Sequence, residues 1–173
     1  MRLFIAAQLP ETVHEALAEE SGMLRGCVRG RYVSPDSFHV TLAFLGDVES
    51  SRIDTVTSAL EKGCSGIGSF EVSLGEYGSF GRRGKATLWQ GFREEGDLSV
   101  LADSIRVQLD EAGIAFDGKA FRAHVTLMRA ADLKDGILPV PVDARGTIDR
   151  VTLFRSDLSG RRPVYEPLQT VCL

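Results

Sequence analysis

The sequence has few cysteines, and their spacing excludes two common kinds of stabilising site. Cys27, Cys64 and Cys172 are odd in number and widely separated, and no Cys-x-x-Cys pair occurs. This is not the spacing of a structural zinc site or of a disulfide framework. The pattern predicts reduced thiols in a cytosolic protein whose apolar core, rather than cross-links, holds the fold together.

Long apolar runs are also missing. Residues 3–7 form an apolar opening that is too short for a signal peptide, and Pro10 follows it without a small-residue cleavage site. No later stretch approaches the roughly 20 apolar residues of a membrane helix. We expect a cytoplasmic protein without a membrane partner, in which residues 3–7 form a buried first strand.

An excess of basic residues is the third absence. The 173 residues carry a formal net charge of −4 and are 43% hydrophobic. This length and apolar content suffice for one ordinary domain with its own core. A protein that binds nucleic acid mainly by neutralising many phosphates needs a broad basic face, which this composition does not favour. Any nucleic acid must therefore be held locally.

Hydrophobic periodicity and turn residues predict alternating strands and helices. Strands are expected at residues 2–9, 38–45, 70–77, 86–92, 121–128, 146–154 and 164–173, and helices at residues 10–24, 51–62 and 98–109. Residues 26–31 are expected to form a loop, and Gly63 to end the second helix. The Gly-rich loop at residues 78–85 does not match a phosphate-binding P-loop, because Ser79 and Ala86 replace its glycine and its hydroxyl residue.

The sequence His-Val-Thr-Leu occurs twice, at residues 39–42 and 124–127. With only three histidines in the chain, composition alone would repeat it with a chance on the order of one in a thousand. Both copies fall in predicted strands, where side chains alternate between faces. The histidine and threonine of each copy should share one face, while the valine and leucine anchor the other face in the core.

The two copies occupy the same place in a repeated plan. The first predicted helix begins near Pro10 and the third near Gly96, and the interval from helix start to the motif histidine, His39 or His124, is nearly the same in both cases. The two histidines are separated by about half of the chain. We infer one domain, residues 1–173, made of two lobes related by a pseudo-twofold axis, each with one motif.

Such an axis would bring two imidazoles and two hydroxyls together. Cleavage of a phosphate ester needs a base for the attacking water, an acid for the departing oxygen and donors to the other phosphate oxygens. Histidines with an ordinary pKa near ~6.5 can supply base and acid, and Thr41 and Thr126 can supply donors. No metal or cofactor is required. The competing interpretation, two merely hydrogen-bonded strand histidines, does not explain the recurring threonine; His14, which lacks one, is expected at the surface.

These motifs and their surroundings resemble the 2H phosphoesterase superfamily, and within it the RNA 2′,3′-cyclic phosphodiesterase (2′-5′ RNA ligase-like) family. The similarity covers nearly the whole chain. The matching segments are residues 2–6 with Leu9 and Pro10, residues 38–46, Leu88 with Trp89, Phe121 with residues 124–129, and residues 153–168 with Ser156, Leu158, Gly160, Tyr165 and Leu168.

The resemblance implies a bilobal α+β fold with two antiparallel-rich sheets, outer helices and a central cleft lined by the two His-x-Thr strands. It implies metal-independent opening of an RNA 2′,3′-cyclic phosphate to a 2′-phosphate, with reversible ATP-independent 2′-5′ ligation in some members. We assign His39 to protonate the leaving 3′ oxygen and His124 to activate water, although the exchanged roles fit the symmetric motifs nearly as well. We expect a monomer.

Further contacts to the substrate are expected around these motifs. Arg129 follows the second motif and can offer a forked donor to phosphate. Phe44, Phe80 and Trp89 are candidates for stacking a base, and Arg82, Arg83 and Lys85 for holding flanking phosphates.

Two alternative functions use the same cleft. One is a 2H phosphoesterase that acts on another cyclic or 2′-5′ linked nucleotide. The other is a non-catalytic module that binds RNA ends. The presence of histidine and threonine in both motifs argues against the second, because a binding module does not need two titrating groups.

Overall fold

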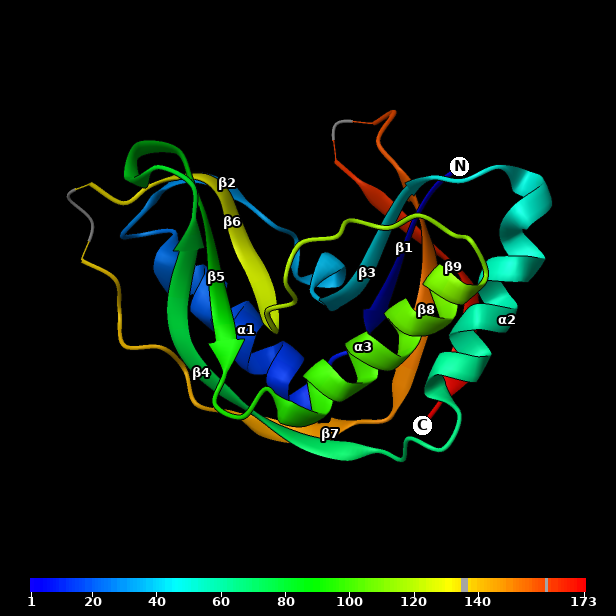
Figure 1. Ribbon diagram of the computed structural model, residues 1–173. Coiled ribbons are helices and arrows are strands. Elements are labelled where there is room, and N and C mark those ends of the chain that lie inside the picture. Colours follow the sequence, from blue (N-terminus) through cyan, green and yellow to red (C-terminus); the bar gives the residue numbers. More distant parts are fainter. Residues whose placement is uncertain (135–136, 161) are drawn as a thin grey trace.

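The computed structural model describes residues 1–134, 137–160 and 162–173, and it contains two antiparallel sheets with helices packed on them (Figure 1). One sheet has the strand order β3-β1-β8-β9 and the other β2-β6-β5-β4-β7. The strands are β1 (Arg2–Ala7), β2 (Arg29–Tyr32), β3 (Val40–Asp47), β4 (Phe70–Phe80), β5 (Ala86–Phe92), β6 (His124–Asp132), β7 (Arg145–Ile148), β8 (Arg150–Asp157) and β9 (Val164–Cys172). The helices are α1 (Glu11–Leu24), α2 (Ile53–Cys64) and α3 (Gly96–Glu111), with 3-10 turns η1 (Pro35–Ser37), η2 (Ser50–Arg52) and η3 (Arg83–Lys85). The predicted α+β fold is confirmed.

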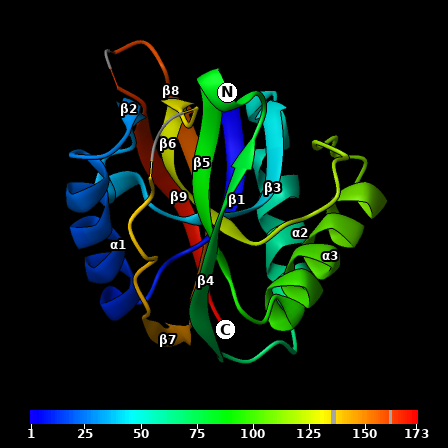
Figure 2. The same ribbon diagram turned by 90° about the vertical axis from the view of Figure 1, so that its left-hand side faces the viewer.

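The helices lie on opposite sides of the molecule (Figure 2). Helices α2 and α3 pack against each other and against β3, β8 and β9 of the four-stranded sheet. Helix α1 packs on the five-stranded sheet, where the Tyr77 hydroxyl of β4 donates to the buried Glu20 carboxyl at 2.6 Å. Each sheet therefore has one face covered by helix, which leaves its other face available to the space between the sheets.

Helix α1 shows why these segments become helical. It begins directly after Pro10, and Glu11 places a negative charge in the first turn, where the helix dipole favours it. Val13, Leu17 and Leu24 lie on one face and are fully buried, and burial of each such side chain contributes about 1.5–3 kcal/mol. Among the helices of the described ranges, none is both long and apolar enough to cross a bilayer.

Strand β1 is the buried first strand that the sequence predicts. Residues 3–7 are all buried, with exposed fractions of 4% or less. The strand pairs with β3 on one edge and with β8 on the other, so it lies inside the sheet. Its apolar run is continuous because both of its faces contact other parts of the protein.

Two strand predictions are wrong. Residues 26–31 were expected to form a loop, but β2 begins at Arg29 and pairs with β6. Its sequence, Arg-Gly-Arg-Tyr, lacks alternating apolar residues, and the backbone of β6 rather than a buried face holds it in the sheet. The single strand expected at residues 146–154 is two strands, β7 and β8, which separate at Asp149 and enter different sheets.

The expected helix stop at Gly63 is also wrong, because α2 continues to Cys64. The glycine instead allows two helices to approach each other. A Cβ atom at Gly63 would lie 2.7 Å from the Cα atom of Ile105 in α3. Any larger residue would push α2 away from α3, so close packing explains the glycine better than helix termination.

The two sheets repeat one arrangement around their motif strands. Without β2, the order β6-β5-β4-β7 corresponds to β3-β1-β8-β9, with the motif strand first in each row. The interval from Glu11, the first residue of α1, to His39 equals the interval from Gly96, the first residue of α3, to His124. These correspondences support the proposed division into two related lobes, which stays a prediction.

Candidate active site

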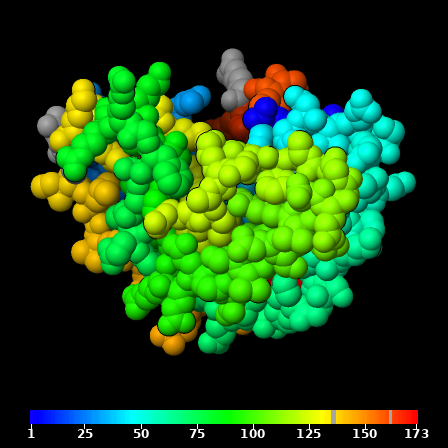
Figure 3. Space-filling model, in the orientation of Figure 1, coloured from blue at the N-terminus to red at the C-terminus, as the bar shows by residue number. Residues whose placement is uncertain are grey.

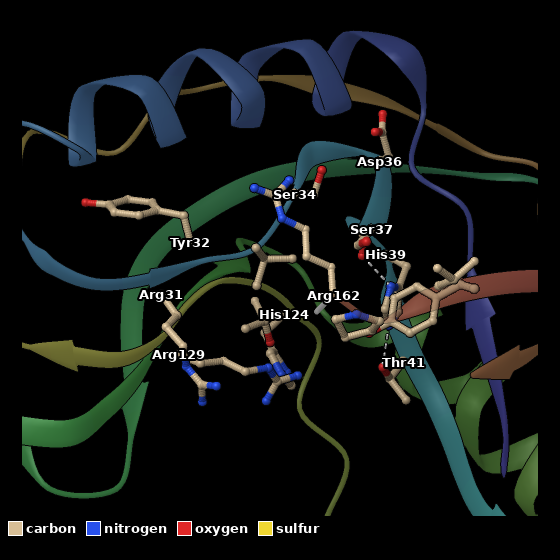
Figure 4. A pocket seen from close by; sticks show the side chains of 15 residues that line it. Arg31, Tyr32, Ser34, Asp36, Ser37, His39, Thr41, His124, Arg129 and Arg162 are labelled. Carbon is tan, nitrogen blue, oxygen red and sulfur yellow. Dashed lines mark hydrogen bonds between the residues drawn. The ribbon is translucent and has the colours of Figure 1, made fainter. Parts of the chain in front are cut away.

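A cavity of about 770 Å³ brings the two motifs together (Figure 4). The space-filling view shows an indentation at the upper edge of the molecule, with green and yellow residues on its left and orange and cyan residues on its right (Figure 3). The lining consists of β2 and the turn after it, both motifs, and the start of β9. Its described residues are Arg31, Tyr32, Val33, Ser34, Asp36, Ser37, His39, Thr41, His124, Thr126, Arg129, Arg162, Pro163, Val164 and Tyr165.

His39 lies just before β3, not inside a strand as predicted, because the chain leaves the 3-10 turn η1 only two residues earlier. Its Nδ1 atom donates to the Ser37 carbonyl oxygen at 2.7 Å. Its Nε2 atom lies 3.0 Å from the Thr41 hydroxyl oxygen. Because a carbonyl oxygen can only accept, the neutral ring carries its proton on Nδ1 and its lone pair on Nε2.

His124 is the first residue of β6 and is held in the same way. Its Nδ1 atom donates to the Arg122 carbonyl oxygen at 2.7 Å, again the carbonyl two residues earlier in the chain. Nδ1 is therefore occupied in both imidazoles, and Nε2 is the nitrogen that can serve a substrate. At His39 the Thr41 hydroxyl contacts Nε2 and would turn from it to a bound substrate. The predicted alternation is confirmed as well, because the valine and leucine of each motif are fully buried while the threonines are partly exposed.

The expectation of ordinary histidine pKa values is wrong. Desolvation by burial, with smaller contributions from the nearby His124 and Arg129, lowers the pKa of His39 to about 4, although the hydrogen bond to the Ser37 carbonyl acts in the opposite direction. Desolvation also lowers the pKa of His124, while its backbone hydrogen bond and Glu95 act in the opposite direction. Both imidazoles are thus neutral at pH 7 in the free protein. A phosphate anion between them would raise both pKa values, because it favours the charged rings.

Two aromatic rings hold the His39 imidazole. The Phe4 ring from β1 lies 4.9 Å from it, centroid to centroid, and the Tyr165 ring of β9 meets it edge-on at 5.4 Å. The two aromatic rings also contact each other at 4.9 Å. This cluster shields the imidazole from water, which is the burial that lowers its pKa.

Aromatic rings also hold His124. Trp89 of β5 lies 5.5 Å from its imidazole, and Phe80 at the end of β4 meets it edge-on at 5.1 Å. Gly78 makes room for this cluster, because a Cβ atom there would lie 2.1 Å from the Trp89 ring. Each imidazole is therefore fixed on one side by aromatic packing and on the other by a backbone carbonyl.

A β-bulge follows each motif threonine. The pairs that frame it are Ala6–Thr41 and Ile5–Ala43 in one sheet, and Trp89–Thr126 and Leu88–Met128 in the other. Because of the extra residue, two consecutive side chains point into the core, and the alternation of side chains between the two faces is displaced by one residue beyond it. The third residue after the threonine, Phe44 or Arg129, therefore returns to the face of the threonine.

The structure brings the motif residues to one cavity but leaves several other candidates outside its lining. His39, Thr41, His124, Thr126 and Arg129 all line the cavity. Phe44, Phe80, Arg82 and Lys85 are not among its lining residues. Arg82 and Lys85 lie in the exposed connection between β4 and β5, and the Arg2 guanidinium covers Phe44 at 4.8 Å. Phe80 nevertheless lies against the His124 imidazole, whereas the positions of Phe44, Arg82 and Lys85 do not support a contact with substrate. The part of all four residues in substrate binding stays a prediction.

Sequence reasoning missed Arg31, Arg162 and Tyr165 as cavity residues. Arg31 was hidden because the segment that holds it was predicted to be a loop without a partner. Arg162 lies in the connection between β8 and β9 and Tyr165 near the start of β9, both far from either motif in sequence. Tyr165 was noticed only as a position shared with the 2H superfamily.

A distant side chain holds the segment before each histidine. His14 of α1, which was expected at the surface, is half-buried, and its Nε2 atom contacts the Pro35 carbonyl oxygen of η1 at 3.0 Å. On the other side, the Ala123 N–H donates to a Glu95 carboxylate oxygen at 3.3 Å. These contacts restrain the turn that presents His39 and the strand end that presents His124.

The arrangement as a whole supplies two imidazoles, two threonine hydroxyls and three guanidinium groups around one cavity. Within the described residues, no group of three histidine, cysteine or acidic side chains is placed to hold a metal ion. All three cysteines are free thiols. Such a site can move protons to and from a bound anion and can donate hydrogen bonds to it.

Known proteins are similar to this chain in sequence and fold. The family model described as LigT-like phosphoesterase matches residues 8–89. The RNA 2′,3′-cyclic phosphodiesterase of Archaeoglobus fulgidus is 28% identical over 176 residues, 98% of each chain. A crystal structure from Thermus thermophilus aligns with a TM-score of 0.86 and 30% identity over 100% of this chain and 98% of that one. E. coli LigT complexed with 3′-AMP aligns with a TM-score of 0.82 and 27% identity over 99% and 97% of the two chains. The chain therefore belongs to the LigT-like phosphoesterase family of the 2H superfamily.

Proposed function

We propose that the protein hydrolyses the 2′,3′-cyclic phosphate of RNA ends to a 2′-phosphate, with its two imidazoles as acid and base and without a metal. The observation that carries this proposal is the meeting of both His-x-Thr motifs in one cavity, with each Nδ1 held by the carbonyl two residues earlier. The A. fulgidus relative is named for this substrate, and E. coli LigT was crystallised with 3′-AMP.

In this mechanism the reaction is a displacement at phosphorus with one proton transfer on each side. His124 Nε2 takes a proton from water as the water oxygen attacks phosphorus. His39 Nε2–H gives a proton to the 3′ oxygen as its bond to phosphorus breaks, which leaves the phosphate on the 2′ oxygen. Thr41, Thr126 and Arg129 donate to the other phosphate oxygens, where negative charge builds up. Exchange with solvent then restores the starting protonation of both imidazoles.

The environments of the two imidazoles bear on this assignment of roles. Both rings are half-buried, and the lowered pKa of His124 keeps it neutral, as a base for water must be. His39 must be protonated to act as the acid, although its pKa in the free protein is about 4. The bound phosphate anion supplies the field that raises this pKa, so the acid becomes charged only when substrate is present.

The same site would also support ligation. A 5′-hydroxyl of a second RNA can take the place of water, lose its proton to His124 and attack the cyclic phosphate while the 3′ oxygen leaves. The product is a 2′-5′ linkage, and no ATP is consumed because the cyclic ester replaces an activated phosphate. Both motifs come from one chain, so a monomer suffices for either reaction. Free thiols at all three cysteines fit the reducing cytoplasm.

The test is incubation of the protein, in excess EDTA, with 2′,3′-cyclic AMP and with a short RNA that ends in a 2′,3′-cyclic phosphate. Chromatography then separates 2′-phosphate from 3′-phosphate products. We expect only 2′-phosphate, at the same rate with and without the chelator. Formation of the 3′-phosphate would contradict the proposed direction of opening. Loss of activity in EDTA, restored by a divalent cation, would contradict the two-histidine reaction.

A further inference from the structure

Two arginines of neighbouring strands line the cavity beside each other. Arg31 of β2 and Arg129 of β6 are direct cross-strand partners, and both belong to the cavity lining (Figure 4). Like charges placed opposite each other on two strands are destabilising. Among the described residues, no ion pair involves either guanidinium. A bound anion would remove this unfavourable pairing, so the pair has the character of an anion site.

The backbone that carries the two arginines is irregular, and surrounding contacts hold it in place. Ala130, next to Arg129, has a φ of 52°, in the left-handed region that non-glycine residues rarely adopt. The register of β2 against β6 also shifts between Arg29 and Arg31. On the other strand, the Tyr32 hydroxyl donates to the Leu24 carbonyl oxygen at 2.7 Å and so anchors β2. Strain of this kind persists where surrounding contacts hold the backbone, and it is common at binding sites.

The backbone positions of the arginine pair lie along β6 from the motif threonine that would contact the reacting phosphate. Arg129 stands three residues after Thr126, and a strand advances about 3.3 Å per residue, which places the pair about 7–10 Å along β6 from the threonine. This is comparable to the spacing of successive phosphates in a nucleotide chain. The long side chain of Arg129 can span this separation toward the reacting phosphate, and Arg31 stands opposite Arg129 on the neighbouring strand.

The positive charge in the cavity lining is larger than the negative charge of one cyclic phosphate. Arg31, Arg129 and Arg162 line it, whereas Asp36 is the only acidic residue in its described lining. A cyclic phosphate carries a single negative charge. Strand β2, which brings Arg31, also has no counterpart in the four-stranded sheet. The additional cation thus comes from the one strand that the repeated arrangement does not require.

We propose that Arg31, together with Arg129, forms a second phosphate subsite that binds the phosphodiester joining the terminal nucleotide to the one before it. This inference rests on the proposed function, since it names the substrate as an RNA chain end rather than a free cyclic nucleotide. A diester at this position would neutralise the cross-strand pair, and the mononucleotide, which lacks it, would not. Arg31 is then a specificity-determining residue that does not touch the reacting phosphorus.

The experiment compares three substrates with a terminal 2′,3′-cyclic phosphate: the mononucleotide, the dinucleotide, and the dinucleotide with an uncharged methylphosphonate linkage. We expect wild-type kcat/KM to be highest for the charged dinucleotide. Arg31→Gln should lower that value by about 10- to 100-fold, the effect of one charge-assisted hydrogen bond, and leave the other two substrates unchanged. Arg29→Gln is the matched control, because Arg29 lies on the same strand outside the cavity lining, and it should behave as wild type.

An equal loss for all three substrates would overturn the proposal, because Arg31 would then act on the reacting phosphate. No loss for the charged dinucleotide would also overturn it. If wild type cleaved none of the substrates, the proposed function would fail, and calorimetric binding of the dinucleotide ending in a 2′-phosphate would still decide the subsite. Arg31→Gln should bind the charged dinucleotide more weakly than wild type does and bind the methylphosphonate dinucleotide equally well, which would support the subsite. Equal binding of the charged dinucleotide by wild type and Arg31→Gln would overturn it.

Discussion

Phe44 and Arg129 occupy the same position in the two motif strands, three residues after the motif threonine and directly beyond a bulge. One position carries an aromatic ring beneath the Arg2 guanidinium, and the other carries a guanidinium that lines the cavity. The two motif strands therefore share a backbone pattern, while the residues beyond the bulges make the two sides chemically different. We expect this difference to give an asymmetric substrate one preferred direction of binding.

Removal of either imidazole should nearly abolish activity. We expect His39→Ala and His124→Ala each to lower kcat for a cyclic phosphate by about 10²-fold or more, because each removes one proton transfer. A substrate with sulfur in place of the 3′ oxygen separates the two roles, since a thiolate leaves without a proton. It should restore most of the activity of His39→Ala and little of that of His124→Ala. The opposite pattern would exchange the acid and base.

The buried imidazole of His39 should make stability depend on pH. Its pKa is about 4 in the folded protein, below its ordinary value, so between these pH values the unfolded chain binds more protons. Stability from this group is present above pH ~6.5 and falls as the pH decreases toward 4. The expected loss from pH 7.5 to pH 5 is about 2 kcal/mol, measured by urea unfolding. Over the same pH range, the stability of His39→Gln should fall by about 2 kcal/mol less than that of wild type. An identical loss of stability in both proteins would argue against a depressed pKa.

The contact between His14 and the Pro35 carbonyl should position His39 through η1. We expect His14→Ala to lower kcat by about 3- to 10-fold with little change in KM, because a small displacement of a proton-transfer group slows chemistry more than binding. His14→Gln, which keeps a side-chain N–H, should recover part of the loss. A purely structural role predicts instead that both variants lose stability and that neither changes kcat at a temperature where the protein is folded.

Gly78 should be required for the aromatic cluster that holds His124. Gly78→Ala places a methyl group against the Trp89 ring, and such overpacking costs about 1–3 kcal/mol. We expect a lower melting temperature and reduced kcat, since the ring that moves also packs on the imidazole. Gly68→Ala is the control, because a Cβ atom at Gly68 meets nothing within 4 Å. Equal melting temperatures of the two variants would contradict this account of the cluster.

The motif part of the site could be predicted because its information is local. A histidine and a threonine two residues apart share a strand face wherever the strand lies, and the apolar residues between and after them fix which face is buried. The equal interval from helix start to histidine then relates the two copies. None of this required knowledge of the partner strands.

The rest of the site and of the fold could not be predicted, because it depends on strands and side chains that are distant in sequence. Strand β2 exists because β6 pairs with it, so Arg31 cannot be placed from its own segment. The pKa of His39 depends on shielding by rings from β1 and β9, which a sequence window does not contain. The separation of β7 from β8 at Asp149 likewise reflects two different pairing partners, β4 and β1.

The four-stranded sheet joins early and late parts of the chain, since β1 lies between β3 and β8, and β9 closes the sheet beyond β8. During synthesis, β1 and β3 leave the ribosome long before the strands that complete their sheet. Contacts of such large sequence separation form slowly and leave an unpaired edge exposed in the meantime. His39, although translated early, is therefore among the last residues to be enclosed by its neighbouring strands. A nascent chain that stalls before β8 contains the first motif but cannot form the complete site.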